Sequence, residues 1–277
     1  MNRATLPRGA YGLTVRGLER SEILVPSPGD AWPTVRIEQD RIDGESPPTG
    51  ITADRAELRL LGGSQLVLER QRRVATFLTP EPLDDDELAH PYLAPVGAVF
   101  AGWLGREAFH AGAFAAGGGA WALLGEKEDG KSTTLAWLAL AGCAVLTDDI
   151  LVVEGRTALA GPRCVDLREP AARRLGLMDR AGAARSGERR RLPLPPIESE
   201  APLRGWIFLT WGDRVELTPL RPPDRLVRLA RHHNGRVSSN ETALLDLAGL
   251  RAWELRRPRN WELLPEIGER LLGLAAG

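Results

Sequence analysis

Hydrophobic and polar positions divide the chain into a first part of short apolar runs and a second part of alternating strands and helices. In the first part, Pro, Gly and Asp interrupt the apolar runs, which is the pattern of strands joined by tight turns. We expect strands at 11–15, 21–25, 34–37, 55–61 and 65–75. The pattern predicts a β-rich N-terminal module over residues 1–90, which ends in the turn-rich segment 80–92.

From residue 91 onward the pattern is that of an α/β domain. Apolar periodicity and turn residues favour strands at 108–114, 120–124, 143–146, 150–153 and 157–166, and helices at 131–141 and 169–177. Residues 206–209 and 215–220 resemble strands that pair with each other, whereas 225–277 look mainly helical and end in an amphipathic helix over 261–274. We expect residues 91–277 to form one domain with C-terminal helices.

The segment 179–200 is polar and rich in Arg, Gly and Pro, so we expect an exposed mobile loop there. Its arginines include Arg185, Arg189, Arg190 and Arg191. The cluster of Arg189, Arg190 and Arg191 either clamps the transferring phosphate or an acidic peptide, or simply lies in a solvated loop of an arginine-rich protein.

Composition narrows the classes of function. The 277 residues have a net charge of −1, which gives no indication of a nucleic-acid partner. The sequence has no apolar run long enough for a membrane span and no apolar signal core near Met1, so we expect a cytoplasmic protein. Cys143 and Cys164 fit no metal-binding spacing, and we expect two buried free thiols.

The segment Gly125–Ser132 has the G-x-x-x-x-G-K-[S/T] pattern of a Walker A phosphate-binding loop, or P-loop. The chain contains two lysines, and both lie in this loop. A strand before the loop and a helix after it are the required context, because backbone N–H groups at the helix start bind phosphate. We expect ATP to contact Gly125, Glu126, Lys127, Glu128, Asp129, Gly130, Lys131, Ser132 and Thr133.

Within this loop, Lys131 is expected to lie between the β- and γ-phosphates, and Ser132 to offer its hydroxyl to Mg²⁺. The structural alternative is a surface loop that only caps a helix. Three acidic residues inside the loop are unusual for an anion site and are tolerable only if they point to solvent or metal: Glu126, Glu128 and Asp129.

Asp148 and Asp149 follow the strand after the P-loop helix, where one carboxylate can hold Mg²⁺ and the other can accept a proton. The alternative is an Asp pair that caps a turn. His110 lies 15 residues before Gly125 in a predicted strand, where a lone histidine is more often structural. The adjacent His232 and His233 fit a metal site poorly, since neighbours on a helix face different directions.

This combination of a histidine strand, a P-loop and an Asp pair resembles the catalytic domain of HPr kinase/phosphorylase, over about residues 107–170. The resemblance implies a fold related to phosphoenolpyruvate carboxykinase, and it implies ATP and Mg²⁺ as cofactors. By position, it implies that His110, Lys131, Asp148 and Asp149 are catalytic. The wider family includes kinases of peptide natural-product pathways, which phosphorylate a serine of a precursor peptide.

The chain also departs from the family. The P-loop interior is charged, and the family's later glutamate in an arginine-glycine context is absent as such. Asp166 either replaces that glutamate as a metal ligand, beside Ser132 and Asp149, or forms a salt bridge at a strand end. Arg163 or Arg168 either contacts the γ-phosphate or is likewise structural. These departures argue against HPr itself as the acceptor.

The sequence therefore predicts an α/β P-loop phosphotransferase with a smaller β-rich N-terminal module. The expected reaction is transfer of the γ-phosphoryl group of ATP to a serine of a peptide or small protein, with no nucleic-acid or membrane partner. Two alternatives stay open: a kinase of a sugar or nucleoside, and a non-catalytic nucleotide-binding partner protein. The oligomeric state is also open, and the resemblance allows a homo-oligomer.

Overall fold

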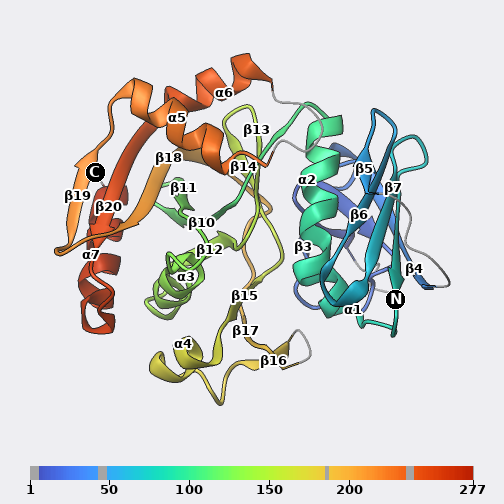
Figure 1. Cartoon of the computed structure of the whole chain (residues 1–277), viewed down its shortest axis with the longest axis horizontal. Helices are drawn as coiled ribbons and strands as arrows, with labels where there is room; N and C mark the ends of the chain where they lie inside the picture. The colour runs from blue at the N-terminus through green and yellow to red at the C-terminus, as the bar shows by residue number, and fades with distance from the viewer. Residues whose placement is uncertain (1–5, 43–48, 185–186, 235–239, 277) are drawn as a thin grey trace.

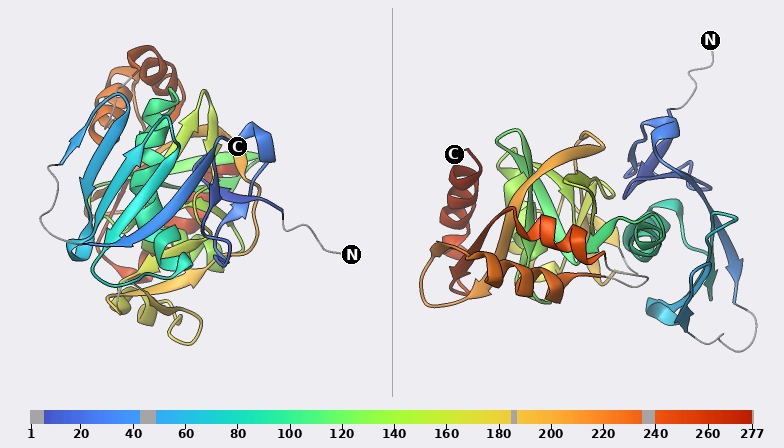
Figure 2. Two further views of the ribbon diagram at one scale, coloured as in Figure 1. Left: turned by 90° about the vertical axis from the view of Figure 1, so that its right-hand side faces the viewer. Right: turned by 90° about the horizontal axis from the view of Figure 1, so that it is seen from above.

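The computed structural model describes residues 6–42, 49–184, 187–234 and 240–276. It is a mixed α/β structure with an eight-stranded, a nine-stranded and a three-stranded sheet. The eight-stranded sheet lies on one side of helix α2 (Leu93–Trp103) and the nine-stranded sheet on the other (Figures 1 and 2). The predicted mixed α/β class is confirmed.

The eight-stranded sheet is built from strands between residues 8 and 79, in the order β3-β1-β2-β4-β8-β7-β6-β5. Its strands are β1 (Arg8–Ala10), β2 (Leu13–Arg16), β3 (Val25–Pro26), β4 (Thr34–Arg41), β5 (Gly50–Ile51), β6 (Arg55–Arg59), β7 (Gln65–Glu69) and β8 (Val74–Thr79). The β-rich prediction is confirmed for this part, with two corrections. The expected strand 21–25 overlaps β3 only at Val25, and the expected run 65–75 is a hairpin, because residues 70–73 form its turn.

Helix α2 follows the short helix α1 (Asp85–Glu87) and is buried on nearly all sides. A helix that is apolar all round belongs in a core. Its side chains join a hydrophobic cluster that includes Phe77 of the first sheet and Val152 of the second. The predicted division near residue 90 therefore falls just before an element that packs on both sheets, and the division itself stays a prediction.

Tyr11, in the turn between β1 and β2, contacts residues of the second part of the chain. It has a left-handed φ of 58°, and its backbone N–H donates to the Ala160 carbonyl at 2.6 Å. The side chain is fully buried, and burial together with the charge of Asp149 raises the pKa of its hydroxyl. The N-terminal module thus lies directly behind the acidic tip that carries Asp148 and Asp149.

The nine-stranded sheet is built around the order β12-β10-β11-β18-β14-β13-β9, with β20 paired to β18 and β19 paired to β20. The strands are β9 (Glu107–Phe109), β10 (Ala111–Ala116), β11 (Gly119–Leu124), β12 (Ala144–Thr147), β13 (Leu151–Glu154), β14 (Thr157–Leu159), β18 (Glu200–Trp211), β19 (Glu216–Pro219) and β20 (Arg251–Arg257). The expected strand 108–114 is divided at His110. The expected pairing of 206–209 with 215–220 is wrong, because β20 lies between β18 and β19.

Helices cover both faces of this sheet (Figure 1). α3 (Lys131–Leu140) and α7 (Leu264–Ala276) contact each other on one face, whereas α5 (Pro222–His232) and α6 (Glu241–Ala248) lie on the other. Each face has its own apolar cluster. Strands β11, β18 and β20 run parallel, so the P-loop, Trp211 and Arg257 all lie at one edge of the sheet.

The third sheet, in the order β15-β17-β16, corrects the expectation of a mobile loop at 179–200. Its strands are β15 (Cys164–Leu167), β16 (Gly182–Ala184) and β17 (Arg189–Pro193), and α4 (Glu169–Arg174) follows β15. The predicted strand 157–166 is therefore two strands, β14 and β15, which belong to different sheets. Arg185 lies outside the described residues. Among the described helices, none has both the length and the apolar character that a membrane span requires.

Candidate phosphotransfer site

The P-loop connects β11, the buried strand before it, to the first turn of α3. Gly130 has φ 76°, a left-handed conformation that glycine adopts without strain. A Cβ atom on Gly125 would lie 3.0 Å from the Cβ of Asp129, so a side chain there would require Asp129 to shift. The predicted strand-loop-helix context of the phosphate-binding pattern is therefore present.

Lys131 lies at the centre of this loop. Its Nζ donates to the carbonyl oxygens of Gly125 at 2.6 Å and Glu126 at 3.1 Å. The side chain is buried, and burial lowers the pKa of the ammonium group. A compact cation fixed at the N-terminus of a helix is suited to an anionic ligand.

The charged loop interior is held by specific partners rather than pointing only to solvent. The Asp129 carboxylate accepts from the Glu126 backbone N–H at 2.6 Å. Arg257 donates to the Asp129 carbonyl. Glu128 has a left-handed φ of 74° and forms an ion pair with Arg168 at 2.6 Å. The aspartate thus occupies a backbone amide that a P-loop normally offers to phosphate.

Asp148 and Asp149 lie at the tip between β12 and β13, opposite the start of α3. Ser132 Oγ donates to Asp148 Oδ1 at 3.1 Å, and the Asp149 backbone N–H donates to the same oxygen at 3.0 Å. Asp148 is 4% exposed; burial, together with the charge of Asp149, raises its pKa to about 7. The hydroxyl-carboxylate pair is the oxygen donor set that Mg²⁺ prefers.

His110 occupies the break between β9 and β10. Its backbone N–H donates to the His232 carbonyl at 2.8 Å, which fixes the break against the end of α5. Its Nδ1 lies 3.7 Å from Asp149 Oδ1, and both side chains are partly exposed. Burial and the charge of Lys131 lower the pKa of the imidazole, so it is neutral near pH 7.

One cavity of about 690 Å³ brings most of the predicted site residues together. The predicted residues that line it are His110, Lys127, Glu128, Gly130, Lys131, Ser132, Thr133, Asp148, Asp149 and Asp166. The other predicted residues, Gly125, Glu126 and Asp129, lie in the loop that surrounds Lys131. The cavity is large enough for a nucleotide-sized ligand.

Asp166 reaches this cavity from β15, but Arg191 holds its carboxylate. Arg191 Nε lies 2.8 Å from Asp166 Oδ1, and Arg191 Nη2 lies 3.1 Å from Asp166 Oδ2. His90 and Cys164 are also close, with ligand atoms within 4.8 Å of one another and of Asp166. The role of Asp166 as a metal ligand stays a prediction; the salt bridge that was its alternative is present.

The two arginines considered for the γ-phosphate lie in different places. Arg168 lines the cavity and pairs with Glu128. Arg163 instead donates to the backbone carbonyls of Leu194 and Glu22, away from the P-loop. Of the arginines on β17, Arg189 lines the cavity.

The cavity residues that the sequence analysis did not predict include an aromatic ring and two cations: Trp211, Arg257 and Arg259. The guanidinium carbons of Arg257 and Arg259 lie 4.4 and 4.8 Å from the centre of the Trp211 ring system. Arg257 is buried, and burial lowers its pKa to about 10. One sequence signal pointed to this region, the short apolar run before Trp211. Arg257 and Arg259 had no such signal, because the segment that contains β20 was expected to be helical.

Comparison with known proteins adds little to this geometry. No protein-family model matches the chain, and no curated protein matches it. Among solved structures, the chain is similar to the HPr(Ser) kinase/phosphatase from Coxiella burnetii, with 12% sequence identity and a TM-score of 0.33. That match covers 60% of this chain and 96% of the other. At this TM-score the likeness carries no argument, and the case for function rests on the residues of the site.

Proposed function

We propose that this chain is an ATP-dependent phosphotransferase that moves the γ-phosphoryl group to a serine hydroxyl of a peptide or small protein. One observation supports the proposal most strongly: the Ser132–Asp148 hydrogen bond joins the P-loop helix to the Asp pair in the same cavity as Lys131. A loop that only capped a helix would not need a buried carboxylate opposite its first hydroxyl.

In this proposal the chain's own groups share three tasks. Lys131 and the backbone N–H groups at the start of α3 bind and neutralise the phosphates. Ser132 and Asp148 hold Mg²⁺, which supplies positive charge to the triphosphate when bound. The more exposed Asp149, oriented by His110, accepts the proton of the acceptor hydroxyl.

Binding and transfer can be measured separately. Isothermal titration with ATP in the presence of MgCl₂ reports binding, and release of ADP with serine peptides, sugars or nucleosides reports the acceptor. We expect Asp149→Asn to bind MgATP about as tightly as the wild type and to lose transfer. If Asp149→Asn instead weakens Mg²⁺ binding, Asp149 is a metal ligand, as the sequence also allowed.

The charged loop favours one second candidate, a nucleotide-binding protein without transferase activity. Asp129 occupies the Glu126 amide, which reduces the positive potential available to a γ-phosphate. This candidate is established if the wild type binds MgATP and releases no ADP with any acceptor class. ADP release with sugars or nucleosides alone would instead identify a small-molecule kinase.

A further inference from the structure

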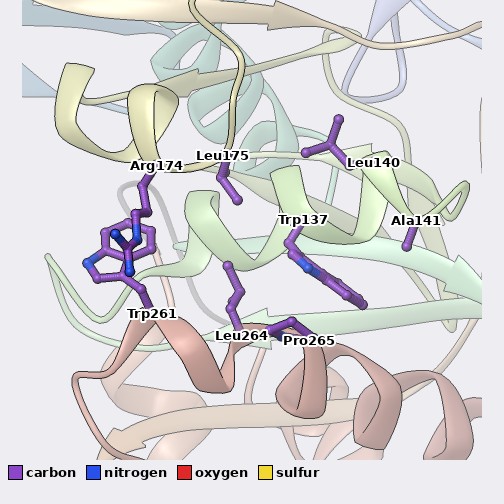
Figure 3. A pocket seen from close by; sticks show the side chains of 8 residues that line it. All are labelled: Trp137, Leu140, Ala141, Arg174, Leu175, Trp261, Leu264 and Pro265. Atoms are coloured by element: carbon purple, nitrogen blue, oxygen red, sulfur yellow. The ribbon is translucent and has the colours of Figure 1, made fainter.

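An apolar hollow of about 400 Å³ lies beside the phosphate cavity. Figure 3 shows the side chains that line this hollow. Its walls come from the second half of α3, from α4 and from the segment that starts α7. The residues that carry its chemistry are Trp137, Leu140, Arg174, Leu175, Trp261 and Leu264. Nothing in the proposed phosphotransfer step uses this hollow.

The hollow gathers unusually exposed apolar side chains. Leu140 is 37% exposed and Trp261 is 41% exposed, and both are among the few large hydrophobic side chains that the described residues leave exposed. Apolar side chains gathered at one concave surface, rather than scattered singly, mark binding sites.

The hollow adjoins the phosphate cavity, because Trp261 and Leu264 line both. Lys131 and Leu140 are at opposite ends of α3, so the phosphate position and the hollow are about 14 Å apart along the helix. An extended peptide covers that distance with about four residues. A polypeptide whose serine reaches the P-loop is therefore long enough to place a nearby side chain in the hollow.

The positive charges near the hollow also favour a polypeptide as its occupant. The exposed Arg174 lines the hollow and the exposed Arg259 lines the adjoining cavity, so cations border the route between them. Guanidinium groups in such positions pair with carboxylates of a bound chain. A sugar or a nucleoside is too short to occupy the P-loop and this hollow together.

We propose that the hollow docks the acceptor polypeptide by one large apolar side chain, about four residues from the phosphorylated serine, with an acidic residue between the two. This inference rests on the proposed function and names the recognition that would select the acceptor. Removing the apolar side chain should raise the KM for the peptide about tenfold, as expected for loss of one buried aliphatic group.

The test uses acetylated, amidated 17-residue peptides with one central serine in a Gly/Ala/Glu background. A phenylalanine is placed two, four or seven residues from the serine, on either side, and kcat/KM is measured with the full chain and MgATP. We expect a maximum at a separation of about four on one side. Replacing the intervening glutamate by glutamine should lower kcat/KM.

Two substitutions test the hollow itself. Leu140→Ser should remove the preference for phenylalanine while leaving the rate on the peptide without it unchanged, and Ala141→Trp, which fills the hollow, should do the same. The matched control is Leu245→Ser, an exposed leucine on α6 outside the hollow. Thermal unfolding of each variant shows whether it is folded.

The remaining outcomes distinguish a failure of the docking inference from a failure of the proposed kinase function. Equal phosphorylation of all peptides overturns the docking inference and leaves the kinase proposal standing. If no peptide is phosphorylated, anisotropy of fluorescein-labelled peptides decides: binding that requires phenylalanine and Leu140 supports docking without the kinase, whereas no binding overturns both. A wild-type dimer that Leu140→Ser dissociates shows that a second copy occupies the hollow, which also overturns the inference.

Discussion

The buried carboxylate of Asp148 predicts a measurable effect of pH on the free energy of unfolding. Its pKa is raised from 3.8 to about 7 by burial and by Asp149. Between those pH values the folded chain binds one more proton than the unfolded chain, so stability falls as pH rises through this window. The difference of about 3 pKa units corresponds to a cost of about 4 kcal/mol above pH 7.

Asp148→Asn should remove this cost. Asn keeps an oxygen that can accept the hydrogen bonds from Ser132 and from the Asp149 backbone N–H. Its new NH₂ group needs a partner, which returns about 1 kcal/mol. We expect the variant to be about 3 kcal/mol more stable than the wild type at pH 8, and less than 1 kcal/mol more stable at pH 5.

Urea unfolding followed by tryptophan fluorescence, without metal or nucleotide, measures the free energy of unfolding at both pH values. The matched control is Asp213→Asn, an exposed position where we expect little change at either pH. A gain for Asp148→Asn that is equal at pH 5 and pH 8, or a loss at pH 8, would refute the argument that this carboxylate is destabilised by burial.

Three further predictions concern the loop and its metal. Lys131→Met should weaken ATP binding and lower transfer about 10²-fold or more, measured by titration and ADP release, since it removes the fixed cation. Asp129→Ala should tighten ATP binding several-fold, because it frees the Glu126 amide and removes a negative charge; unchanged or weaker binding contradicts this. Mg²⁺ affinity of the nucleotide-free chain should rise with pH through about 7, since Asp148 must lose its proton to bind metal, and a flat profile contradicts this.

The sequence was most informative where local chemistry dictates local structure. The P-loop and its helix could be placed because glycines, one lysine and a hydroxyl at fixed spacing, between a strand and a helix, are typical of a phosphate-binding loop. The Asp pair could be placed because it follows the next predicted strand. His110 was expected inside a strand. It lies instead at a break, where β9 pairs with β13 and β10 pairs with β11 and β12, and its backbone N–H donates to His232, more than a hundred residues away.

The elements that were predicted wrongly depend on partners that lie far away in the sequence. β20 was expected to be helical, since its strand geometry depends on pairing with β18 on one side and β19 on the other. The arginine-rich segment was expected to be mobile, yet β17 is fixed by β15 and by the pair between Arg191 and Asp166. Propensity and composition cannot report such tertiary partners.

Whether the P-loop and the Asp pair form one phosphotransfer site is tested most directly by following label from [γ-³²P]ATP. The wild type is incubated with Mg²⁺ and a serine-peptide pool, alongside the double variant Asp148→Asn/Asp149→Asn. We predict acid-stable phosphoserine with the wild type and none with the variant. Binding of MgATP by the wild type without transfer of label to any peptide, or equal transfer by the variant, would contradict the account.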